Sequence, residues 1–235
     1  MSRPVVLAID GPAGAGKSTV AEQLARELGY FYFDTGALYR AVSVCCLDNG
    51  TDLSDEAALE QLVRQIDIQV RPASVEDGRQ LDVLLHGRDI SHEIRTPQVD
   101  AVVSKVAASP VVRGGLIDLQ RRQIQGRGTI LAGRDIGTVV CPDADLKIFL
   151  TASPAERAHR RLVQVGGSPD QLAAVQAALE ERDRRDSSRA IAPLVAAEDA
   201  IEVNTDGKSV ELVIQTIREL LARRLDERER ARADR

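Results

Sequence analysis

The chain has 235 residues, of which 43% are hydrophobic and 29% charged, the balance of a soluble globular protein with one core, or one core carrying a smaller inserted lobe. Its formal net charge of -5 argues against a protein that binds duplex nucleic acid through a basic face, but allows a local basic site for a small anion. No stretch approaches the roughly 20 apolar residues of a membrane span, and the first apolar run is too short for a signal peptide. We therefore expect a cytoplasmic protein that contacts neither membrane nor nucleic acid.

The chain opens with a strand, a glycine-rich turn, a helix and a second strand. Residues 5–9 are β-branched and apolar and end at the turn signal formed by residues 10–12. Apolar residues then recur at helical spacing over 20–28, before Gly29 closes the helix. Residues 30–33 form the next strand, which predicts a parallel unit with a right-handed crossover.

The alternation of strands and helices continues along the chain. Buried strands are predicted at 129–132, 147–150 and 200–203, and helices at 55–65, 97–109, 110–125, 154–165, 170–187 and 209–229. Five strands separated by helices predict an α/β fold, a doubly wound parallel five-stranded sheet with helices on both faces.

One stretch follows a different period. From residue 66 to about 91 apolar residues alternate with polar ones, with turns at Pro72, Asp77-Gly78 and 86–88, which predicts a small inserted antiparallel β-sheet. The residues after Leu225 alternate in charge without an apolar face, which predicts a fraying, solvated helix end. The cysteines are expected to be buried thiols and the histidines to have no chemical role; they are Cys45, Cys46, Cys141, His86, His92 and His159.

Residues 11–18 fit the pattern G-x-x-x-x-G-K-[ST] between a strand and a helix, the context that supports a phosphate-binding P-loop. Its glycines let consecutive backbone N–H groups turn toward an anion, and the following helix points its positive end at the phosphates. Lys17 would supply a charge to the β- and γ-phosphates, and Ser18 a hydroxyl to Mg²⁺. We therefore expect ATP and Mg²⁺ as cofactors, with ATP bound by Gly11, Pro12, Ala13, Gly14, Ala15, Gly16, Lys17, Ser18 and Thr19.

A P-loop alone defines only a superfamily. GTPases carry an N-K-x-D guanine-binding motif, which this sequence lacks, and ATP-driven machines carry an acidic pair after a hydrophobic strand, where this chain has Thr151-Ala152-Ser153. A kinase for a small molecule is the class that remains.

Two segments carry candidate acceptor-binding residues. After the second strand, Thr35 lies where backbone approaches a ligand, and Arg40 lies one helical turn further on, where it can fork onto a phosphate. Arg134 and Asp135 follow the third buried strand of the parallel sheet, and ligands gather at the carboxyl ends of such strands. Taken alone, these segments also fit a helix start with a surface arginine and a local ion pair.

Arginines are concentrated further along the chain, at positions 157, 160, 161, 182, 184, 185 and 189, on both sides of the flexible connection 165–169. A run of charge is usually a solvated face. In an acidic chain this concentration favours an arginine-rich lid that closes over the phosphates and stabilises the transferring group. The expected catalytic residues are Lys17, Arg157, Arg161, Arg182 and Arg185.

Six segments together resemble the bacterial cytidylate kinases, a family of nucleoside monophosphate kinases, from residue 5 to about 219. They are GPAGAGKST at 11–19, DTGALYR at 34–40, EIRTPQV at 93–99, GRDIGTVVCPDADLKIFL at 133–150, ERAHRRL at 156–162 and RDSSRAIAPL at 185–194. The resemblance implies transfer of the γ-phosphoryl group of ATP to CMP or dCMP, and we expect the protein to be a monomer. It also implies a CORE (1–34, 97–155, 190–225), an NMP-binding region (35–96) and a LID (156–189).

The resemblance also implies roles for individual residues. Ser104, Arg113 and Asp135 would bind the cytosine, Arg40, Arg134 and Arg189 its phosphate, and Arg182 and Asp186 the sugar, with Thr35 beside them. A carboxylate such as Asp135 accepts well from the cytosine amine, and Arg113 suits the O2 and N3 acceptors. A kinase for another small acid or nucleotide is the alternative within enzymes, and an ATP-dependent switch the alternative outside them.

Overall fold

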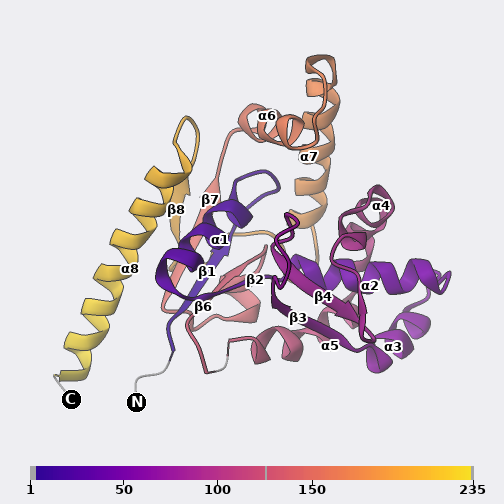
Figure 1. Cartoon of the computed structure of the whole chain (residues 1–235), viewed down its shortest axis with the longest axis horizontal. Coiled ribbons are helices and arrows are strands. Elements are labelled where there is room, and N and C mark those ends of the chain that lie inside the picture. Colours follow the sequence, from indigo (N-terminus) through magenta and orange to yellow (C-terminus); the bar gives the residue numbers. More distant parts are fainter. Residues whose placement is uncertain (1–3, 125, 234–235) are drawn as a thin grey trace. The chain divides into compact units, whose positions relative to one another are not determined.

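A computed structural model describes residues 4–124 and 126–233 of the chain (Figure 1). The chain divides into two compact units. The first consists of Met1–Tyr32 together with Gly126–Arg235, and the second of Phe33–Gln125. Among the described residues, no helix has both the length and the apolar character needed to cross a bilayer.

A five-stranded parallel sheet confirms the predicted fold class, in the order β2-β6-β1-β7-β8. All residues of β1 and β6 are buried on both faces, which explains why their sequences read as apolar runs. The register pairs Ile9 of β1 with Ala132 of β6 and with Ile148 of β7, so the carboxyl ends of these strands lie together. The strands are β1 (Val6–Asp10), β2 (Phe31–Asp34), β6 (Thr129–Ala132), β7 (Leu146–Thr151) and β8 (Ile201–Asn204).

The helices of the first unit agree with the predicted ranges. They are α1 (Lys17–Leu28), α6 (Pro154–Gln164), α7 (Leu172–Ser187), preceded by the short 3-10 turn η3 (Pro169–Gln171), and α8 (Val210–Ala233). Gly29 ends α1 in the left-handed conformation, and the Ser153 hydroxyl caps α6 by accepting from the N–H of Glu156. A small apolar cluster of Ala13, Ala158 and Leu179 packs the P-loop against α6 and α7.

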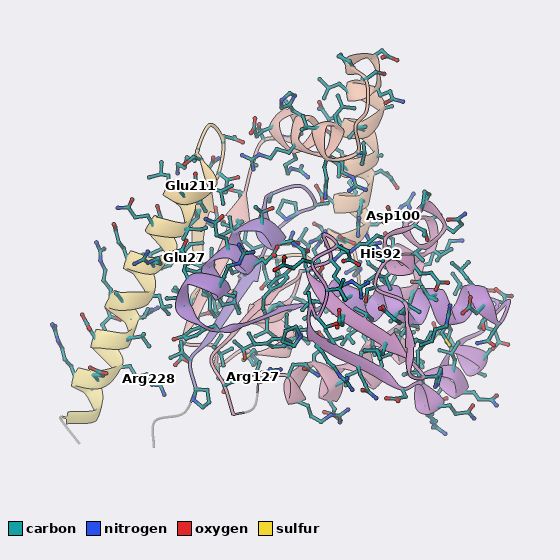
Figure 2. The ribbon with its side chains drawn as sticks, viewed as in Figure 1. Glu27, His92, Asp100, Arg127, Glu211 and Arg228 are labelled. Carbon is teal, nitrogen blue, oxygen red and sulfur yellow. The ribbon has the colours of Figure 1, made fainter. Side chains whose placement is uncertain are left out.

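The end of the C-terminal helix is solvated over the residues that the structure describes, as predicted, but one of its arginines has a distant partner. Helix α8 continues to Ala233, and the guanidinium of Arg228 (labelled in Figure 2) donates to the buried carboxylate of Asp145 at 2.7 Å. Asp145 also accepts from the N–H of Val6, at the start of β1. The alternating charges are mostly exposed, but one of them ties the helix to the amino-terminal ends of β1 and β7. Charge alternation alone does not reveal this long-range pairing.

The second unit contains the predicted antiparallel insert. The insert forms a three-stranded sheet in which Val70 of the first strand pairs with Val83 of the second. Burial alternates at the start of the first strand, where Ile68 and Val70 are buried. Arg79 holds the turn of this sheet through ion pairs with Asp77, Asp82 and Asp89. The elements of the unit are α2 (Gly36–Asp48), α3 (Glu56–Gln65), β3 (Ile68–Pro72), β4 (Leu81–Leu85), β5 (Arg88–Asp89), η1 (Glu93–Arg95), α4 (Pro97–Val106) and α5 (Pro110–Arg122). The three cysteines are buried thiols, as predicted.

Candidate active site

The P-loop joins β1 to α1 through glycines in the left-handed region. Gly11, Gly14 and Gly16 have φ values of 145°, 78° and 90°. A Cβ at Gly11 would lie 2.2 Å from the carbonyl oxygen of Leu150, so no larger residue fits there. Gly16 is the N-cap of α1, and the helix therefore presents its N-terminal amides to the loop. This backbone is shaped to bind phosphate.

Two side chains at the start of α1 point to nucleotide chemistry. Lys17 is buried, and its Nζ donates to the carbonyl of Pro12 at 2.7 Å, so the ammonium lies across the loop. Ser18 is half-buried in the first turn and offers a hydroxyl oxygen, the type of ligand that Mg²⁺ prefers. Both residues fit the roles that the motif predicts.

A buried carboxylate beside the P-loop holds two arginines. Asp186, 2% exposed, accepts from Nε of Arg134 at 2.9 Å and from Nη2 of Arg189. Nη1 of Arg134 also donates to the carbonyl of Gly11 at 3.1 Å. Burial alone would raise the pKa of Asp186, but the neighbouring Arg134 and Arg189 outweigh it, and the pKa lies below the ordinary value. Asp186 is therefore ionised and orients two guanidinium groups. The guanidinium groups suit a phosphate, and the carboxylate suits a hydroxyl.

Asp135 is 5% exposed and stands at the start of a single-turn π-helix, η2 (Ile136–Val140). Such turns are rare and often lie at functional sites. The backbone N–H groups of the next two residues, Ile136 and Gly137, donate to the carboxylate of Asp10, the last residue of β1. Burial raises the pKa of Asp10 to about 6, against the two amide hydrogen bonds that lower it.

The predicted lid arginines fall into two groups. Arg157 is 5% exposed and donates to the carbonyls of Ala13 and Ala152 and to Asp183, whose other oxygen accepts from the N–H of Ala13 at 3.2 Å. In contrast, Arg185 is exposed and paired with Glu181. The remaining arginines bond elsewhere in the first unit: Arg160 with Thr205 and Glu156, Arg161 with Gln164, and Arg184 with Glu181, while Arg182 is half-buried on α7.

The second unit holds the other predicted acceptor residues. Arg40 donates to the carbonyl of Ile94 at 2.8 Å and to Asp100 (labelled in Figure 2) at 2.6 Å. Arg113 is buried, donates to the carbonyl of Ala107 and lies 5.4 Å from the ring centroid of Tyr39. The remaining two are Thr35, which is buried, and Ser104, which is half-buried on α4.

The structure thus gathers the P-loop, Arg134, Asp135, Asp186, Arg189 and the lid arginines in the first unit, and Thr35, Arg40, Ser104 and Arg113 in the second. Sequence reasoning missed Asp10, Asp183 and Asp100. The sequence marks Asp10 as part of a turn, although a lone acid at the end of an apolar strand is a signal of its own. Asp183 looks like an ordinary acid on a charged helix, and Asp100 like an ordinary acid in the first turn of a helix.

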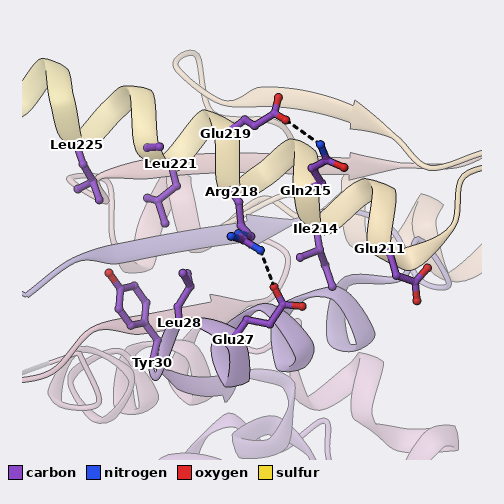
Figure 3. Close-up of a pocket in the computed structure, with 11 residues that line it drawn as sticks. Glu27, Leu28, Tyr30, Glu211, Ile214, Gln215, Arg218, Glu219, Leu221 and Leu225 are labelled. Carbon is purple, nitrogen blue, oxygen red and sulfur yellow. Dashed lines mark hydrogen bonds and ion pairs between the residues drawn. The ribbon is translucent and has the colours of Figure 1, made fainter.

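A groove lies at the opposite end of α1 from the P-loop. Leu28, Tyr30, Ile214 and Leu221 line it, and Arg218 donates to Glu27 across it at 3.3 Å (Figure 3). The 12 residues of α1 span about 18 Å, which separates the groove from the phosphate loop. The groove is therefore not the nucleotide site.

A parallel sheet with a glycine P-loop, a lysine across it and paired arginines beside it defines a P-loop protein that handles nucleotide phosphates. A family model described as cytidylate kinase matches residues 7–223, and the chain belongs to this family. It is 47% identical over 215 residues to the cytidylate kinase of Pseudomonas aeruginosa strain LESB58, covering 90% of this chain and 93% of the relative.

Longer relatives match as well. The bifunctional pantoate ligase/cytidylate kinase of Synechococcus elongatus is 52% identical over 218 residues, covering 92% of this chain and 41% of the relative. The bifunctional protein of the same description from Synechococcus sp. strain WH7803 is 48% identical over 223 residues, covering 94% and 45%. The chain thus spans less than half the length of these bifunctional relatives.

Proposed function

We propose that the chain transfers the γ-phosphoryl group of ATP to CMP, and to dCMP, giving CDP or dCDP and ADP for pyrimidine nucleotide metabolism, as a monomer in the cytoplasm. The observation that carries the proposal is the Arg134–Asp186–Arg189 cluster bonded to Gly11 of the P-loop. This cluster supplies acceptor-phosphate ligands beside the donor-phosphate loop. Family membership supports the same reaction.

The ATP half of the reaction rests on the P-loop. Backbone N–H groups within residues 11–19, where Pro12 has none, bind the β- and γ-phosphates. Lys17 neutralises the charge that grows on these phosphates. Mg²⁺, held by the Ser18 hydroxyl and by the nucleotide, would offset the charge of the β- and γ-oxygens.

The acceptor half rests on arginines. Arg40, Arg134 and Arg189 bind the phosphate of CMP and orient one of its oxygens for in-line attack on the γ-phosphorus. The new P–O bond forms as the bond to the β,γ-bridging oxygen breaks, and the electron pair leaves on ADP. A phosphate oxygen needs no general base, which agrees with a site built from cations. Arg182 and Asp186 bind the sugar.

Arginines of the predicted lid stabilise the remaining negative charge of the transferring phosphoryl group. We assign Arg161, Arg182 and Arg185, which lie on α6 and α7, to the transferring group. Arg157 is assigned to the same group, acting close to Ala13 of the P-loop, with which it already bonds.

Base recognition follows from hydrogen-bond polarity. Asp135 accepts from the exocyclic amine of cytosine, Arg113 donates to O2 and N3, and Ser104 and Thr35 complete the acceptor ligands. Uracil replaces the amine with a carbonyl and protonates N3, so it presents the wrong polarity to Asp135 and Arg113.

The proposal is tested by offering CMP, UMP, AMP and shikimate in parallel with ATP and Mg²⁺ and measuring each phosphorylated product. We expect the highest kcat/KM for CMP. A higher value for AMP or shikimate would overturn the assignment, and ATP hydrolysis without transfer to any acceptor would favour a switch.

A further inference from the structure

The carboxylate of Asp10 joins two ligand-binding segments of the first unit. Asp10 is 5% exposed, and its Oδ1 accepts from the N–H of Ile136 at 2.9 Å and its Oδ2 from the N–H of Gly137 at 2.8 Å. These amides belong to residues 133–137, which we call the acceptor segment because it carries two residues proposed to bind CMP. The residue after Asp10 is Gly11 of the P-loop.

In a second set of bonds residues 133–137 are again the donors, and one of these bonds comes from the side chain of Arg134. Nη1 of Arg134 donates to the carbonyl of Gly11 at 3.1 Å, and the N–H of Gly133 donates to the carbonyl of Ile9 at 3.0 Å. Because the side chain of each segment bonds the backbone of the other, the bonds fix the orientation of the acceptor segment as well as its position.

We propose that Asp10 is a positioning residue for the acceptor nucleotide. By holding the amides of Ile136 and Gly137, it sets the direction in which Arg134 and Asp135 present their side chains to CMP. This inference rests on the proposed CMP kinase function. It differs from a purely structural role because it requires acceptor binding to change when the two bonds change.

The protonation state of Asp10 offers a way to change those bonds in the native protein. Burial raises its pKa to about 6, so the group titrates within the range of assays. An ionised carboxylate accepts both amides, whereas a protonated one turns an O–H donor toward one of the two N–H donors. Two charged groups act on Asp10: Asp135 before the π-helix raises this pKa, and Lys17 on α1 lowers it. On β7, the residue paired with Asp10 is the uncharged Phe149. Lys147 of β7, whose side chain lies beside Gly137, is paired with Asp199.

The chain provides a matched control at the other end of β1. Asp145 is also buried and accepts from the N–H of Val6 at 2.9 Å, at the end of β1 that is remote from the P-loop. Asp10→Asn should raise the KM for CMP about tenfold, because the side-chain NH₂ of the asparagine would face one of the two backbone N–H donors. The KM for ATP should stay within about twofold. Asp145→Asn should leave both KM values within about twofold, even where it lowers stability.

The pH dependence separates positioning from stability. The ratio of wild-type to Asp10→Asn kcat/KM for CMP should fall toward one below pH about 6, and the titrations of the substrates cancel in this ratio. Without any variant, the ¹⁵N–¹H signals of Ile136 and Gly137 in the ligand-free protein should shift with a midpoint near that pH.

The assignment of Asp10 would be overturned if the NMR signals of Ile136 and Gly137 did not shift with pH. An unchanged KM for CMP in Asp10→Asn would overturn it as well. Wild-type protein that forms no CDP would refute the proposed function and this inference with it. Wild-type turnover combined with an unchanged KM in Asp10→Asn would refute only the inference.

Discussion

Asp186→Asn should lower the free energy of unfolding more than substitution of an exposed residue does. It removes the buried negative charge that two guanidinium groups face. The native oxygens of Asp186 bond Arg134 at 2.9 Å and Arg189, and the side chain is 3% exposed. An asparagine keeps one acceptor and turns an N–H₂ group toward the other guanidinium. Hydrogen bonds to charged groups contribute about 1.5–3 kcal/mol each, and breaking a buried pair costs about 3–5 kcal/mol, so we expect a loss of about 3 kcal/mol.

Urea unfolding followed by circular dichroism measures this loss, with the exposed Asp226→Asn as control. The pKa of Asp186 is lowered in the folded state, so its contribution is complete above the unfolded pKa and is lost as pH falls through the folded pKa. The difference in unfolding free energy between wild type and Asp186→Asn should therefore shrink from pH 7 to pH 3. A variant within about 0.5 kcal/mol of the Asp226→Asn control at pH 7 would refute the reasoning.

Four further substitutions test other parts of the site. Lys17→Ala should reduce kcat on the order of 10³-fold or more with an unchanged far-ultraviolet spectrum, and near-normal turnover would remove the P-loop from the mechanism. Asp135→Asn should lower the ratio of CMP to UMP kcat/KM roughly 5- to 150-fold, whereas Arg40→Ala should lower both efficiencies alike; equal losses in Asp135→Asn would mean that another residue reads the base. Gly11→Ala should destabilise the protein by on the order of 3 kcal/mol in thermal unfolding, since its Cβ would meet Leu150 at 2.2 Å, and an unchanged melting temperature would contradict the loop geometry.

The sequence predicts the fold well because its signals are local. Apolar runs such as residues 129–132 identify buried strands, the period-2 stretch identifies the insert, and the octet at 11–18 identifies the loop between β1 and α1. Each of these patterns depends on neighbouring residues alone, so a single sequence suffices to read them.

The contacts that hold the site together were not predictable, because their partners are distant in the chain. Asp10 bonds amides 126 and 127 residues away, and Arg157 is 26 residues from Asp183. The sequence does not distinguish Arg157 from Arg185, because both lie in the same arginine-rich region. In the structure Arg157 is buried and Arg185 is exposed. Arg228 likewise reaches Asp145 over 83 residues, which no charge pattern reveals.

The most direct test of CMP kinase activity is the stoichiometry of the reaction with CMP, ATP and Mg²⁺, followed by ³¹P NMR. We predict that CDP and ADP appear in equal amounts with wild-type protein. Release of ADP and inorganic phosphate without CDP would contradict the proposed function.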